Sequence, residues 1–241
     1  MGECEGTAAC AGTVTTMGYP DALFSDRSNI PDHDWVLRQT LTFDAAYLKE
    51  KLPDSRMWPS ELDDLPDDGK WRSISRRDVF GIAERAVLEN DPWAASQLHV
   101  AIVAWGAGNK AQRIVRALWP LDDPSAPEKF AKALRVVRGE GALSAYRALN
   151  KRGSLKVHRL GAGFFTKFLY FGGYDAKPYV GYPLIYDSRV VAALNKVTED
   201  EWFDDGPVDM YERYIDLAKN WAWELDTAPD VIERRLFDLG T

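Results

Sequence analysis

Two charged residues, Lys167 and Asp187, are the strongest candidates for chemistry in this sequence. Lys167 follows the glycine turn Leu160-Gly161-Ala162-Gly163, and Asp187 opens the segment Asp187-Ser188-Arg189-Val190. Both positions fit the start of a helix, where free backbone N–H groups and the positive dipole end attract an anion such as phosphate. A neutral lysine can attack carbon and form a Schiff base, and a nearby carboxylate stabilises developing positive charge. The pair therefore predicts a phosphate grip with an amine and an acid beside it.

The protonation state of Lys167 decides whether it can act. A lysine with the ordinary pKa of about 10.4 is charged at neutral pH and is not a nucleophile. Burial among the phenylalanines of residues 164–171 would favour the neutral amine, whereas an ionised Asp187 would favour the ammonium ion. Our hypothesis is that proton transfer between the two groups releases the amine during reaction. The alternative interpretation is an ion pair that only ties two helices together.

The glycine turn, Thr166-Lys167 and the downstream Asp187 resemble the helix-hairpin-helix DNA glycosylases, and more closely the bacterial proteins with an 8-oxoguanine DNA glycosylase fold. The resemblance covers roughly residues 72 to 240. It implies a mainly α-helical, two-lobed protein that rotates a damaged or modified base, with 8-oxoguanine as first candidate, out of double-stranded DNA and excises it. Lys167 and Asp187 would be catalytic without any cofactor, with or without Schiff-base lyase activity at the abasic site. The alternatives are a non-catalytic helix-hairpin-helix DNA-binding protein and a helical protein-interaction domain.

The hairpin, near residues 152–167, departs from the usual pattern of that family. Two phenylalanines separate Gly163 from Thr166-Lys167, so two registers stay open. Either Gly161 and Gly163 form the hairpin with two additional residues, or Gly163 is the first glycine and Phe165 replaces the second. In the second register the phosphate grip loses a glycine. The hairpin residues expected to bind DNA are Gly161, Gly163 and Thr166.

A second glycine-rich turn, Gly106-Ala107-Gly108-Asn109, resembles the glycosylase loop that approaches the gap left by an extruded base. We expect Asn109, Lys110 and Arg113 to contact or wedge the duplex; simple chain reversal between two helices is the alternative. An extruded base also needs an apolar pocket in which to stack. The residues expected to form this pocket are Phe164, Phe165, Trp105 and Trp221.

The net charge of −7 is unusual for a DNA-binding protein, but it is unevenly distributed. Lys and Arg against Asp and Glu number 6 against 14 in residues 1–70, 20 against 10 in 71–197, and 4 against 13 in 198–241. These parts carry −8, +10 and −9. Because salt limits the reach of a charge to about 10 Å, a basic middle part can still hold a duplex. Solvated arginine-rich helices would give the same pattern without DNA.

Composition argues against several other classes of site. Cys4 and Cys10 are the only cysteines, so the four-cysteine iron–sulfur cluster of some helix-hairpin-helix glycosylases cannot form. The three histidines lack the spacing of metal ligands, and we expect no metal. No apolar run reaches the roughly 18 residues that span a bilayer, and the N-terminus lacks the basic residues of a secretory signal. We therefore expect a cytoplasmic monomer that contacts no membrane.

The chain divides into three parts by composition and periodicity. Residues 1–33 predict a disordered leader, and residues 34–70 predict an N-terminal extension that ends in an acidic linker. Within the extension, residues 35–43 favour a strand and residues 44–52 a short helix. Residues 71–241 are expected to form the helical glycosylase-like domain. Apolar periodicity and capping residues predict its helices over 76–88, 92–105, 110–118, 127–138, 141–150, 163–171, 188–196, 208–225 and 229–239.

Overall fold

Helices dominate the computed structural model, which describes residues 18–176 and 182–240. The predicted mainly α-helical class is confirmed. The α-helices of the described residues are α1 (His33–Leu37), α2 (Ala45–Glu50), α3 (Arg76–Glu89), α4 (Pro92–Gly106), α5 (Ala111–Leu118), α6 (Ala126–Gly139), α7 (Ala142–Leu149), α8 (Ala162–Gly173), α9 (Ser188–Val197), α10 (Val208–Glu224) and α11 (Pro229–Leu239). An antiparallel sheet with the order β1-β3-β2 is built from β1 (Thr40–Asp44), β2 (Asp67–Asp68) and β3 (Trp71–Ser75).

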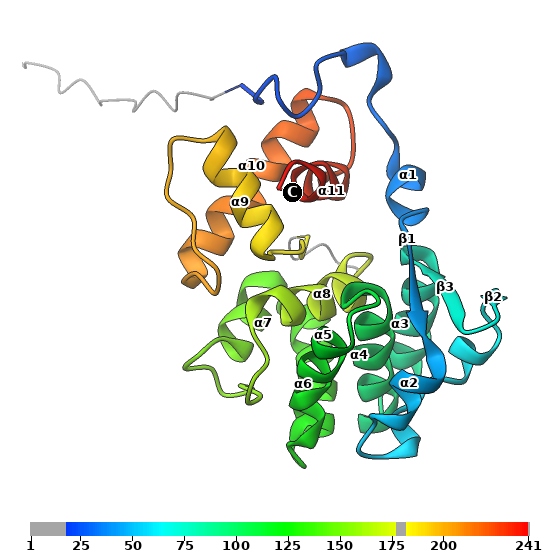
Figure 1. Cartoon of the computed structure of the whole chain (residues 1–241). Coiled ribbons are helices and arrows are strands. Elements are labelled where there is room, and N and C mark those ends of the chain that lie inside the picture. Colours follow the sequence, from blue (N-terminus) through cyan, green and yellow to red (C-terminus); the bar gives the residue numbers. More distant parts are fainter. Residues whose placement is uncertain (1–17, 177–181, 241) are drawn as a thin grey trace, which may run out of the picture.

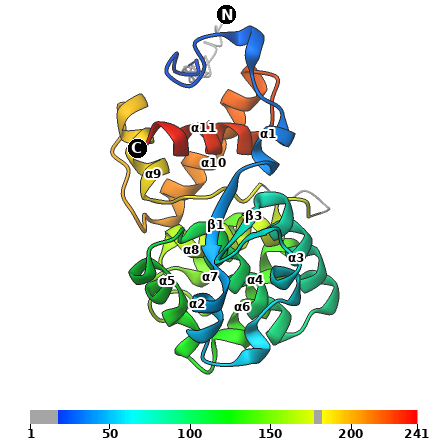
Figure 2. The ribbon, with the colours of Figure 1, turned by 45° about the vertical axis from the view of Figure 1, so that its right-hand side comes forward.

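The elements form two lobes that face each other (Figure 1). The larger lobe holds the sheet and α2 to α8, and the smaller lobe holds α9, α10 and α11. Helix α1 packs on α11, and β1 then carries the chain into the larger lobe (Figure 2). The two-lobed arrangement expected from the resemblance is therefore present. Helix α8 lies in the larger lobe where it faces the smaller one (Figure 1), so its side chains can meet residues of α9.

Capping residues explain where the two central helices begin. Ser75 and Asp78 form a capping box at α3, in which each side chain accepts a backbone N–H of the other. Asp91 caps α4 by accepting two backbone N–H groups, and Pro92 takes the first helical position. Every helix predicted from caps and periodicity is present, and each end lies within two residues of its predicted position.

The N-terminal extension differs from its prediction. Helix α1 occupies the first part of the strand expected over 35–43, because the Asp32 carboxylate caps it by accepting the Trp35 N–H at 3.0 Å. Strand β1 begins only at Thr40 and pairs with β3, which was not predicted. The sequence of β3, Trp-Arg-Ser-Ile-Ser, is too short and polar to stand out as a strand before its partner is known.

Two segments predicted to lie outside the core contribute to it. Residues 53–70 read as an acidic linker, yet Met57 and Leu62 are buried. The leader predicted over 1–33 is described from Gly18 onward, and there Leu23 is fully buried while its carbonyl accepts a hydrogen bond from Arg235 of α11. Residues 1–17 lie outside the described residues. Single apolar residues in a polar context have no period, so their burial cannot be predicted from pattern.

Candidate active site

Lys167 lies in the second turn of α8, as the sixth residue of that helix. Its Nζ donates to the Gly163 carbonyl at 2.7 Å and to Asp187 Oδ2 at 2.6 Å. The side chains of Lys167 and Asp187 are 7% and 14% exposed, so the contact is largely shielded from water. The two residues chosen from the sequence are therefore in direct contact.

Asp187 holds two positions at once. Its Oδ1 accepts the backbone N–H groups of Arg189 and Val190 and so caps α9, as the sequence predicted. Its Oδ2 faces Lys167. Burial by itself would raise the pKa of Asp187, but the Lys167 charge and hydrogen bond, together with the two cap N–H groups, lower it below the ordinary value. Asp187 is therefore an ionised carboxylate at neutral pH.

Thr166 positions this acid and does not reach the surface. It is fully buried, and its Oγ1 accepts the Tyr186 N–H at 2.9 Å while donating to the Ala162 carbonyl at 2.6 Å. A buried hydroxyl with both partners satisfied is not available to a phosphate, so the hydroxyl does not support the DNA-binding role predicted for Thr166, which stays a prediction. The hydrogen bond from the Tyr186 N–H to Thr166 Oγ1 instead ties Tyr186, the residue before Asp187, to the turn that carries Lys167.

The first turn of α8 also differs from both predicted hairpin registers. Gly161 is the N-cap residue and Gly163 is already helical, so the two phenylalanines belong to the helix. A Cβ atom on Gly161 would lie 3.2 Å from Asp205 Oδ1. The same Oδ1 accepts the Ala162 N–H at 2.5 Å. The predicted phosphate grip at this helix start is thus occupied by a carboxylate of the chain itself.

A cavity of about 650 Å³ opens beside the Lys167–Asp187 pair. Both lobes contribute to its wall: β1, the turn after α4 and α8 from the larger lobe, and α9, the segment before α10 and α11 from the smaller lobe. The charged residues in the wall are Lys167, Asp187, Arg113, Arg189, Asp204 and Asp205. The pair therefore faces a polar space large enough for a small molecule or a nucleotide.

One of the four predicted base-pocket aromatics, Phe164, lines this cavity. Phe165 is turned away by one helical step and packs edge-on against Tyr146. Trp105 is buried, and its indole N–H donates to the Gln39 carbonyl. Trp221 is also buried, and neither tryptophan is among the residues that line the cavity. Phe165 of α8, Trp105 of α4 and Trp221 of α10 all face the core and do not line the cavity, so the cavity gives no support to the pocket role predicted for them.

Two aromatic residues outside the predicted base pocket also line the cavity, Tyr186 and, on α11, Phe237. The Phe237 ring lies under the Arg189 guanidinium at 4.5 Å from the ring centroid, and both residues line the cavity. Arg189 was not predicted as a site residue either. Its place in the first turn of α9, two residues after Asp187, is the sequence signal that could have found it. No pattern in the sequence distinguishes Phe237 from the core aromatics.

The turn after α4 reaches the cavity, through Gly106, Ala107 and Gly108. A Cβ atom on Gly106 would lie 3.3 Å from Lys167 Cδ, so this glycine allows the turn to pass close to the lysine stem. Arg113 is exposed and lines the cavity. Asn109 and Lys110 are exposed on the same turn but do not line it. Their predicted contact with DNA stays a prediction.

Acid Asp204 adds a further charge to the cavity. Burial raises its pKa, and the neighbouring Asp205 and Asp187 raise it further.

Among residues 18–176 and 182–240, no cluster of three or more His, Cys, Asp or Glu side chains could hold a metal ion. No helix in that same part of the chain is long and apolar enough to cross a membrane.

A comparison with protein families gives the family of the chain. The family model described as "Putative 8-oxoguanine DNA glycosylase OGG-like protein" matches residues 34–237. The chain belongs to this family. The match begins at residue 34, so it includes α1 and the sheet, which the resemblance over residues 72 to 240 left out. No curated protein and no solved structure matches the chain.

Proposed function

We propose that this member of the OGG-like family is a DNA glycosylase that excises an oxidised purine, with 8-oxoguanine as first candidate. The observation that carries the proposal is the 2.6 Å contact between Lys167 and Asp187 in the wall of the cavity between the lobes. A structural ion pair would not need a cavity. A non-catalytic DNA-binding protein would need neither the cavity nor the pair.

Base excision requires that the damaged nucleotide leave the duplex, because its glycosidic carbon is inaccessible within the stack. The cavity offers the extruded nucleotide two kinds of surface. The rings of Phe164 and Phe237 supply apolar faces, and the Arg189 guanidinium supplies a planar cation on which a base can stack. Arg113, in the cavity wall, adds attraction for the phosphate backbone.

The chemical step breaks the bond between C1′ of the sugar and the base nitrogen. The base leaves with the electron pair of that bond, and positive charge develops on the sugar. The ionised Asp187 stabilises this charge in a site shielded from water.

Lys167 acts as the nucleophile once its proton has passed to a neighbouring acceptor, for which Asp187 Oδ2 lies at 2.6 Å. The amine nitrogen forms a bond to C1′. The C1′–O4′ bond then breaks, O4′ takes up a proton, and the nitrogen forms the double bond of a Schiff base with C1′. Loss of a proton from C2′ would then expel the 3′ phosphate with the electron pair of the C3′–O bond, and this elimination cuts the strand.

The proposal is tested with duplexes that carry a single 8-oxoguanine, incubated with and without borohydride. Wild type is expected to release the base and to form a trapped covalent adduct. Lys167→Gln should form no adduct, whereas the matched control Lys132→Gln, an exposed lysine of α6, should behave as wild type. Base release without an adduct would show that water attacks in place of Lys167. Binding of lesion DNA without base release would favour the non-catalytic alternative.

A further inference from the structure

A second, smaller cavity adjoins the candidate active site. It measures about 290 Å³ and shares the turn residues Gly106 and Ala107, together with Arg113 and Phe164, with the larger cavity. Its remaining wall includes Arg116 of α5 and Arg159 of the segment before α8. We call this cavity the arginine pocket, after Arg113, Arg116 and Arg159.

The three arginines that line the arginine pocket have no acidic partner. No Asp or Glu lines the pocket. Within residues 18–176 and 182–240, none of the three arginines forms an ion pair. Three cations gathered around one pocket repel each other, and this arrangement suits an anionic ligand.

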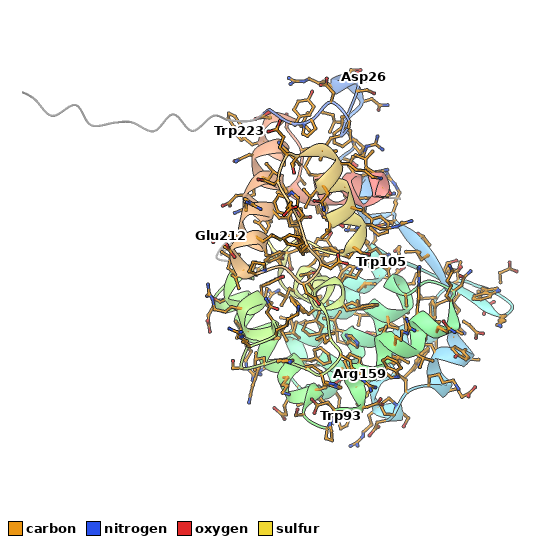
Figure 3. The ribbon with its side chains drawn as sticks, turned by 60° about the vertical axis from the view of Figure 1, so that its left-hand side comes forward. Asp26, Trp93, Trp105, Arg159, Glu212 and Trp223 are labelled. Carbon is orange, nitrogen blue, oxygen red and sulfur yellow. The ribbon has the colours of Figure 1, made fainter. Side chains whose placement is uncertain are left out.

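Arg159 is held in place rather than free. Its guanidinium lies over the Trp119 ring at 4.5 Å from the centroid. Its backbone φ is +64°, a conformation that costs energy for a residue with a side chain. Arg159 is exposed on the larger lobe, where Figure 3 labels it.

The start of α8 cannot take the same anion in this structure. Asp205 already accepts the Ala162 N–H there, and its carboxylate would repel a phosphate. The groove on the other side of this turn is lined by Arg147, Lys151 and Arg152, but Glu140 and Asp205 line it as well. Of these three places around the candidate active site, the arginine pocket alone combines several cations with no acid.

We propose that the arginine pocket binds a phosphate of the DNA strand beside the extruded nucleotide, and that it replaces the helix start as the anchor of the backbone. This inference rests on the proposed function. Guanidinium groups suit the role because their paired N–H groups match the oxygens of a phosphate. The shared wall with the active-site cavity places the anchor next to the nucleotide that reacts.

The test replaces single backbone phosphates around the lesion with uncharged methylphosphonates and measures duplex affinity. For wild type, a methylphosphonate at one position should weaken binding by about tenfold or more. The same substitution should have no further effect on the double variant Arg116→Ala/Arg159→Ala. The salt dependence of binding should also fall by about one unit of slope for each arginine removed. The matched control is Arg135→Ala, an exposed arginine of α6 that lines neither cavity.

A terminal phosphate could supply the same chemistry as an internal one. A second arm therefore uses a duplex nicked beside the lesion, with and without a 5′ phosphate. Tighter binding of the phosphorylated nick than of the intact duplex, lost in the double variant, would assign the pocket to a strand end and overturn the proposal for an internal phosphate.

Equal sensitivity to methylphosphonates in wild type and the double variant would overturn the proposal outright. If wild type excises the base while this result is obtained, the proposed function stands and the anchor alone fails. The circular dichroism melting curve of each variant confirms that it is folded.

Discussion

Two buried ion pairs join the two lobes, and they differ in what surrounds them. Lys167–Asp187 and Arg76–Glu233 each have a shortest N–O distance of 2.6 Å and connect the larger lobe to the smaller one. The first pair opens on a cavity of about 650 Å³. The second is completely buried, at 0% exposure for both side chains. Burial and charge alone therefore do not identify a reactive site in this protein.

We call Arg76–Glu233 the sealed pair and Lys167–Asp187 the open pair. The sealed pair is surrounded by protein groups that satisfy its hydrogen bonds. Arg76 donates to Gln39 as well as to Glu233, and its guanidinium lies over the rings of Trp105 and Tyr170. Burial raises the pKa of Glu233 although Arg76 opposes this effect. All of these partners are protein groups, so the pair has no room for a ligand and its role is structural.

The sealed pair also helps to position the open one. Tyr170 lies one turn after Lys167 on α8 and donates to Asp230 of α11 at 2.8 Å. Helix α11 carries both Glu233 and Phe237. The buried cluster thus holds α8 and α11 in the arrangement that places Lys167 and Phe237 in one cavity wall. The buried cluster and the Lys167–Asp187 pair share helix α8, and the pair is completed by the N-cap residue of α9.

The largest expected effect comes from breaking the sealed pair. Arg76→Met leaves Glu233 buried without a partner and should lower the free energy of unfolding by about 3–5 kcal/mol. Urea denaturation measures this loss. The double variant Arg76→Met/Glu233→Leu should recover much of it, because no charge is then left buried. A loss below about 1 kcal/mol for the single variant would contradict the structural role.

Breaking the open pair should affect activity more than stability. Asp187→Asn keeps an oxygen that can cap α9 but removes the negative charge that faces the sugar. Single-turnover base excision should fall by about 10²–10³-fold. The urea midpoint should change far less than in Arg76→Met. A midpoint loss as large as in that variant would show that the open pair is structural too.

Thr166 provides a finer test of positioning. Thr166→Val removes the acceptor of the Tyr186 N–H and should cost about 1–3 kcal/mol of stability. Excision should slow because Asp187, which follows Tyr186 in the chain, loses its fixed position. The affinity for undamaged DNA should stay unchanged. Thr166→Ser keeps the hydroxyl and should restore both stability and rate. Weaker binding of undamaged DNA by Thr166→Val would instead support the DNA contact predicted for this residue.

The smallest effect is a pH dependence at the edge of the sealed cluster. The hydrogen bond to Asp230 raises the pKa of His33 above its ordinary value, although burial opposes it. The resulting stability is fully present below about pH 6.5 and is lost as the pH rises through the raised pKa. Because the His33 side chain is 40% exposed, we expect less than about 1 kcal/mol.

The comparison with His33→Gln isolates this contribution. The difference in unfolding free energy between wild type and the variant, measured from pH 5 to pH 9, should shrink as the pH rises. A difference that grows with pH would contradict the sign.

Local signals in the sequence were enough for most of the helices and for the Lys167–Asp187 pair. Ser75 and Asp91 mark helix starts through side-chain oxygens that act within a few residues, so no distant part of the chain is needed. Asp187 was found in the same way, as a cap, and Lys167 through its place after a glycine turn. The family membership of the chain follows from the match over residues 34–237.

Sequence by itself therefore determined the helices, the pair and the family. Tertiary structure alone decided which aromatic rings face the cavity, that Asp205 occupies the start of α8, and that three arginines gather without an acid. The physical reason is that capping and periodicity act within one or two turns of chain. A cavity wall is instead assembled from segments far apart in sequence, such as α8 and α11, and only packing brings them together.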